Sequence, residues 1–157
     1  MFLRRLALAV LVSVAAVAPV TGCSPWWAED QPGFAKIGVA MSDGGRVVIL
    51  YEHCQGEAVT AVDLDLLDQR SINTVRTLWS IEANGGGSRI REYTVGEAPS
   101  GFRAVTKLDR QLGSADHLSA SITSSVSGMI PINFEMGRLR ERQVYTSDGF
   151  KSRSEFL

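Results

Sequence analysis

The sequence predicts an all-β protein, an antiparallel β-sandwich of roughly seven to eight short strands. Short runs of alternating apolar and polar residues recur along the chain, and turns rich in glycine separate them. The length agrees, because 157 residues suffice for one domain with one core. A small α+β roll is the alternative, since residues 63–70 and 103–112 could each carry a helical turn.

Eight runs of the chain have the alternation of half-buried antiparallel strands. Their apolar residues share one face, and serine, threonine, arginine and glutamate fill the other. Trp79 is a candidate for the centre of the core, and the hydroxyl residues at 119, 121, 123 and 125 are expected on an exposed face. The runs are residues 36–41, 46–53, 59–66, 77–83, 89–95, 102–108, 117–125 and 130–139, with shared apolar faces at Val62, Leu64 and Leu66, at Trp79 and Ile81, at Leu118, Ala120 and Ile122, and at Ile132, Phe134 and Met136.

Turn residues separate these runs at 42–45, 55–57, 84–87 and 96–101. Asp43-Gly44 and Asn84-Gly85 predict hairpins, because type I′ turns need residues that accept positive φ. The three glycines at 85–87 lack the Lys and Ser/Thr of a phosphate-binding loop and indicate a flexible turn. Residues 144–150 predict a small terminal hairpin, and a mobile tail is the alternative.

The first 22 residues are expected to be a signal peptide and no part of the fold. Arg4 and Arg5 precede an uncharged run from Leu6 to Val20. A membrane-spanning helix needs about 20 apolar residues, so this run is too short to span and has the length of a secretory apolar region.

The segment Val20-Thr21-Gly22-Cys23 resembles the lipobox of bacterial lipoproteins, which has an aliphatic residue, a small residue, Gly or Ala, and an obligatory Cys. This resemblance implies that Cys23 is lipidated and becomes the first residue of the mature chain. The protein would then be anchored to membrane lipid at the extracytoplasmic face of the cell membrane. The alternative is an ordinary secreted protein with a chance cysteine near its cleavage site.

Residues 23–34 are expected to form the lipidated cysteine and a flexible tether, and residues 35–157 a single sandwich domain. Pro25 and Pro32 disfavour a helix or a central strand in the tether. Trp26 and Trp27 are candidate membrane-interface contacts, because an indole ring favours the boundary between lipid and water. The alternative is that one of them packs on the domain edge.

The body of the chain resembles small actinobacterial lipoproteins with fibronectin- or immunoglobulin-like strand patterns. The residues that carry this resemblance are Cys54-Gln55-Gly56, Leu78-Trp79-Ser80-Ile81, Val95-Gly96, Pro99 and Gly101-Phe102. It implies a sandwich and assigns no catalytic residues.

The composition excludes several function classes. A net charge of -1 and a pI of about 6.1 give no basic field for nucleic acid. Two cysteines and two histidines exclude a cysteine-rich zinc module, and no metal or other cofactor is expected. The sequence also lacks the Gly-x-Ser-x-Gly and Ser-x-x-Lys patterns of serine nucleophiles.

Two sets of residues suggest an enzyme, a small envelope hydrolase, as the alternative function. Cys54 is a candidate nucleophile if the fold brings His117 close, although a buried cysteine that acts as a small apolar residue is favoured. Asp63 and Asp65 would share one strand face as a carboxylate pair, although a solvated face is favoured.

Arg138, Arg140 and Arg142 are spaced by two and would project from one side of a strand as a possible interaction surface, with Arg89 and Arg91 as a possible extension. An edge strand that charge protects from aggregation is the favoured alternative. The sequence therefore predicts a lipid-anchored binding or assembly protein of the cell envelope, with an envelope protein or an anionic polymer as its possible partner.

Overall fold

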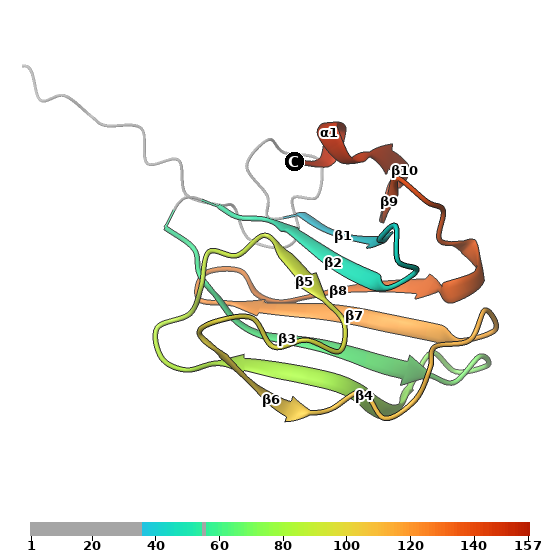
Figure 1. Cartoon of the computed structure of the whole chain (residues 1–157), viewed down its shortest axis with the longest axis horizontal. Coiled ribbons are helices and arrows are strands. Elements are labelled where there is room, and N and C mark those ends of the chain that lie inside the picture. The colour runs from blue at the N-terminus through green and yellow to red at the C-terminus, as the bar shows by residue number, and fades with distance from the viewer. Residues whose placement is uncertain (1–35, 55) are drawn as a thin grey trace, which may run out of the picture.

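The computed structural model describes residues 36–54 and 56–157, which form two five-stranded antiparallel sheets packed face to face (Figure 1). The predicted β-sandwich is thereby confirmed. The signal peptide, Cys23, Trp26 and Trp27 lie outside the described residues.

The first sheet has the strand order β10-β9-β1-β2-β5, and the second sheet has the order β6-β4-β3-β7-β8. The strands are β1 (Lys36–Met41), β2 (Val47–Glu52), β3 (Val59–Leu67), β4 (Thr74–Ala83), β5 (Glu92–Thr94), β6 (Phe102–Thr106), β7 (His117–Ser124), β8 (Gly128–Glu135), β9 (Gln143–Thr146) and β10 (Gly149–Ser152), with a 3₁₀ turn η1 (Met136–Arg138) and a terminal helical turn α1 (Arg153–Phe156).

All eight predicted runs contain a strand, and the terminal hairpin is confirmed as β9 and β10. The helical turns of the α+β alternative do not form, because residues 63–67 continue β3 and residues 103–106 belong to β6. The last predicted run ends early, since the chain leaves the sheet at Glu135 and enters η1.

The core lies between the two sheets and contains the apolar faces that alternation predicts. Trp79 is almost fully buried, as are Leu64 beside it on β3 and Ile122 on β7. Tyr51 and Tyr93 come from the first sheet, and burial raises the pKa of both phenols far above the usual range. Both phenols are therefore neutral at neutral pH.

The two predicted hairpin turns have different outcomes. β1 and β2 form a hairpin, but the residue with positive φ is Gly45, which closes a three-residue loop with a bulge rather than a type I′ turn. The hairpin predicted at Asn84-Gly85 is wrong, because β4 pairs with β6 and the chain crosses to β5 in the other sheet. Gly87 allows this crossing, since a Cβ there would lie 2.9 Å from the Val59 oxygen.

The buried carboxylate of Glu57 lies in the connection from β2 to β3 and stabilises it through hydrogen bonds. It accepts hydrogen bonds from the Cys54 N–H (2.9 Å), the Ser127 N–H (3.2 Å) and the Ser124 hydroxyl. Burial alone would raise the pKa of Glu57, but these hydrogen bonds outweigh it, and the pKa is lowered. Glu57 therefore joins the first sheet to the turn between β7 and β8.

The outer face of the first sheet carries a second, smaller apolar cluster. Phe156 of α1 packs there with Val144, Val48 and Leu50. Gly38 makes this packing possible, because a Cβ at that position would lie 2.9 Å from the Phe156 ring. A capping box between Ser152 and Glu155 fixes the helical turn that carries Phe156.

Replacing Phe156 with alanine is expected to destabilise the fold by about 3 kcal/mol, because a buried aromatic ring is removed from the smaller apolar cluster. Chemical denaturation measures this loss. Leu157 is the matched control, since its side chain is 42% exposed and its truncation is expected to have little effect. Equal stability of the wild type and Phe156→Ala would contradict the role of the smaller cluster.

Replacing Glu57 with glutamine is expected to cost about 1–3 kcal/mol near neutral pH, because a buried acceptor of several hydrogen bonds is altered. The lowered pKa means that Glu57 stabilises the fold above its ordinary value of 4.5 and loses this contribution as the pH falls through the folded value. Urea denaturation between pH 7 and pH 3 tests this. The difference between wild type and variant should shrink towards acid pH, and a constant difference would contradict the assignment.

Candidate functional site

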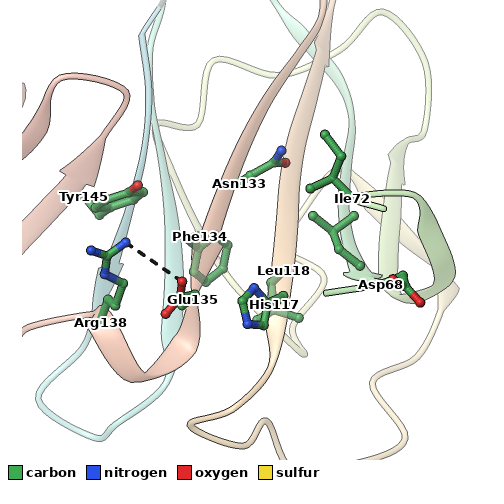
Figure 2. A pocket seen from close by; sticks show the side chains of 10 residues that line it. Asp68, Ile72, His117, Leu118, Asn133, Phe134, Glu135, Arg138 and Tyr145 are labelled. Carbon is green, nitrogen blue, oxygen red and sulfur yellow. Dashed lines mark ion pairs between the residues drawn. The ribbon is translucent and has the colours of Figure 1, made fainter. Parts of the chain in front are cut away.

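Two adjoining pockets lie at the end of the sandwich where the chain crosses from β8 to β9. Figure 2 shows the first, with Arg138 and Tyr145 on one side, Asp68 and Ile72 on the other, and His117 between them. The first pocket has a volume of about 140 Å³ and the second about 530 Å³. Arg138 and Tyr145 line both pockets. The second pocket is otherwise lined by Gly137, Leu139, Arg140, Gly149 and Phe150.

The loop before β7 fixes the position of η1, and therefore of Arg138. The Met136 N–H donates to the Asp116 carbonyl (3.0 Å), and the Gly137 N–H donates to the Ser114 carbonyl (2.9 Å). A side chain at position 137 would collide with that loop, since a Cβ there would lie 2.7 Å from the Ser114 oxygen. The backbone position of Arg138 is consequently fixed by these contacts.

The Asp116 side chain closes the same loop. Its carboxylate accepts from the Gly113 N–H (2.7 Å) and forms an ion pair with Arg110 at 2.9 Å. Burial by itself would raise the pKa of Asp116, but these two donors outweigh it and the pKa is lowered. Asp116 is therefore ionised at neutral pH and belongs to the scaffold of the pockets.

Guanidinium groups and aromatic rings give the pockets their chemistry. Arg138 is exposed, and among the described residues its one ion pair is a long contact of 3.9 Å to Glu135. Arg140 lies over the Phe150 ring at 4.7 Å from its centre, and the Phe150 and Tyr145 rings meet edge to face at 5.3 Å. Such a surface can bind an anionic group through Arg138 while an apolar portion contacts the rings.

The three arginines predicted as an interaction surface do not project from one side of a strand. They lie in η1 and the connection to β9, and Arg142 has a positive φ of 62°. Arg138 and Arg140 line pockets, whereas Arg142 lines neither. The strand placement and the edge-strand alternative are both wrong, because the chain changes sheets at this point.

Arg89 and Arg91 do not extend this group. They precede β5, in a segment whose Ser88 is bridged to Val59 at the start of β3. Val59 also pairs with Ser124 at the end of β7, whereas His117 begins β7 at the pocket end. The two arginines are therefore at the opposite end of the sandwich from the pockets.

Cys54 and His117 are far apart. Cys54 is bound to Glu57, which accepts from Ser124 at the last residue of β7, while His117 is the first residue of that strand. The length of β7 separates them by roughly 23 Å at about 3.3 Å per residue. The fold therefore does not bring Cys54 and His117 together as a nucleophile and its base.

Cys54 is buried, as its favoured interpretation requires, and it is disulfide-bonded in the structure. It thus offers no free thiolate. The sequence contains one other cysteine, Cys23, which lies outside the described residues.

Asp63 and Asp65 do share a face of β3, on the outside of the second sheet. Asp63 accepts from the Ser80 hydroxyl and Asp65 from the Thr77 hydroxyl at 2.7 Å. Burial, followed by repulsion from Asp65 and Glu82, raises the pKa of Asp63, although Ser80 opposes the shift. Neither carboxylate lines a pocket, and this face is less solvated than expected, since Ser119 and Ser121 beside the pair are buried.

Sequence reasoning missed Tyr145, Phe150 and Glu135 as neighbours of the arginines. In the sequence, Tyr145 and Phe150 are recognisable only as aromatic residues of the predicted terminal hairpin. Their contact depends on the pairing of Tyr145 with Phe150 across β9 and β10.

Within residues 36–54 and 56–157, no group of three or more His, Cys, Asp or Glu side chains is placed to hold a metal ion. No helix of that part of the chain is long and apolar enough to cross a membrane. Comparisons with protein-family models, with curated proteins and with solved structures found no match.

Proposed function

We propose that this protein is a lipid-anchored binding or assembly protein of the cell envelope, on the extracytoplasmic side of the membrane. The lipobox ending at Cys23 supports the anchor, and the shared position of Arg138 and Tyr145 in two adjoining pockets supports binding. The proposal depends mainly on the position of Arg138 and Tyr145, because both pockets combine a weakly paired cation with an aromatic ring.

The positions of the two features suit such a role. β1 begins at Lys36, which pairs with Glu52 at the end of β2, so the chain enters the domain near Cys54. The pockets lie at the other end of the sandwich, with the turn between β7 and β8 and the connection from β8 to β9 at opposite ends in Figure 1. A lipid at Cys23 would therefore hold one end near the membrane and leave the pockets accessible to a ligand in the envelope.

The chemistry of the pockets favours a ligand with an anionic group next to an apolar or planar portion. An acidic segment of an envelope protein fits this description better than a uniform polyanion, because the rings of Tyr145 and Phe150 line the second pocket. Binding to a polyanion would rest on charge alone and would weaken steeply with salt.

The anchor is tested by replacing Cys23 with serine, which is expected to move the protein from the membrane fraction to the soluble fraction. Cys54→Ser is the matched control, since it removes the other cysteine, leaves the lipobox intact and should stay with the membrane. Mass spectrometry of the mature wild type should find a diacylglyceryl group on Cys23. A mature chain in which Cys23 is unmodified or disulfide-bonded would overturn the anchor.

The binding surface is tested by the double variant Arg138→Glu and Arg140→Glu, with Arg142→Glu as the control because it reverses the same charge outside the pockets. Proteins that co-purify with the wild type from gently solubilised membranes are expected to be lost from the double variant and retained by the control. Loss of one hydrogen-bonded charge contact typically weakens binding by about tenfold or more. Equal loss in all variants would point to the net charge and not to the pockets.

A further inference from the structure

Two large apolar side chains are exposed at the end of the sandwich where β1 begins, Val126 in the turn between β7 and β8 and Met129 near the start of β8. Val126 is 56% exposed and Met129 is 66% exposed. Contact between these apolar side chains and water is unfavourable. A partner surface that buries them would therefore gain binding free energy.

The backbone beneath these side chains is held firmly. The Ser125 N–H donates to the Ala58 carbonyl (2.9 Å), and the Ala58 N–H donates to the Ser125 hydroxyl (3.1 Å). The Ser127 N–H donates to the buried Glu57 carboxylate. These hydrogen bonds fix the backbone of the turn that carries Val126, and the pairing of Met129 with Thr123 fixes the backbone of the second residue.

Two cations lie at the same end of the molecule. Arg89 and Arg91 are exposed, and neither forms an ion pair with any of the described residues. Hydrogen bonds from His53 to the Ile90 carbonyl (2.9 Å) and from the Tyr51 N–H to the Arg91 carbonyl (2.8 Å) fix their backbone.

The segments that carry the two cations and the two apolar side chains come close together at this end of the sandwich. Ser88 and Ser124 lie on either side of Val59, so their backbones are about 10 Å apart at the usual strand spacing. Apolar side chains beside unpaired guanidinium groups match the boundary of a bilayer, where acyl chains lie below anionic headgroups.

A lipid on Cys23 would bring this end of the domain to the membrane. The segment that separates Cys23 from Lys36 reaches at most about 40 Å at full extension, and it enters the domain at the end that carries Val126, Met129, Arg89 and Arg91. We propose that this end of the sandwich is a docking surface for the anionic phospholipid bilayer, so that the domain rests on the membrane with its pockets facing away. The inference rests on the proposed anchor for its orientation.

Vesicle binding by an unlipidated chain tests the inference separately from the anchor. Residues 23–157 are produced without the preceding segment, and their co-sedimentation is measured with vesicles of phosphatidylglycerol and phosphatidylcholine and with vesicles of phosphatidylcholine alone. The chain is expected to bind the anionic vesicles. The double variant Val126→Ser and Met129→Ser should bind at least about tenfold more weakly.

Charge and control variants complete the experiment. Arg89→Ala with Arg91→Ala should abolish the preference for anionic vesicles and reduce the dependence on salt. Val75→Ser with Val105→Ser is the matched control, because these valines are 59% and 52% exposed on β4 and β6, and it should bind like the wild type. Thermal unfolding verifies that each variant is folded.

Three results would overturn the inference: no binding of the folded wild-type chain to anionic vesicles, equal weakening by the control variant, or loss of a co-purifying protein instead of vesicle binding when Val126 and Met129 are changed. The last result would assign this end to a protein partner. Because the vesicle measurements use only the unlipidated chain, failure of the anchor at Cys23 is detected independently, by the mass of the mature protein.

Discussion

The buried carboxylate of Glu57 is the constraint on which the arrangement of the two sheets depends. A charge without solvent access must be fully hydrogen-bonded, and Glu57 finds its donors at Cys54 after β2 and at Ser124 and Ser127 around the β7–β8 turn. These donors come from segments far apart in the sequence. Satisfying one buried charge therefore fixes where the chain leaves the first sheet and where the second sheet ends.

The polar chemistry of this protein gathers where the chain passes between sheets. The passage from β2 to β3 contains Glu57, the passage from β4 to β5 carries Arg89 and Arg91, and the passage from β8 to β9 carries Arg138 and Arg140. Strand interiors must alternate to fill the core, whereas a crossing segment is free of that requirement. The two ends of the sandwich can therefore differ in chemistry while the sheets between them remain regular.

The two ends of the sandwich differ in the side chains that they expose. One end has exposed apolar side chains above a hydrogen-bonded turn, and the other has pockets whose walls come from both sheets. A lipid anchor alone restrains position but not orientation, because a tether can rotate. Contacts between the domain and the bilayer would restrain orientation as well, and that would present the pockets to the envelope at a constant height.

The sequence by itself determined the fold class, all eight predicted strands, the terminal hairpin and the central place of Trp79, because side-chain alternation and turn chemistry are local properties. It also supplied the resemblance of residues 20–23 to a lipobox and the candidate arginines. Only the tertiary structure decided that Asn84-Gly85 begins a crossing, that Arg138 and Arg140 meet Tyr145 and Phe150, and that Cys54 lies a strand length from His117. These outcomes depend on which strands pair. Pairing minimises buried, unsatisfied polar groups over the whole molecule, and no short stretch of sequence contains that information.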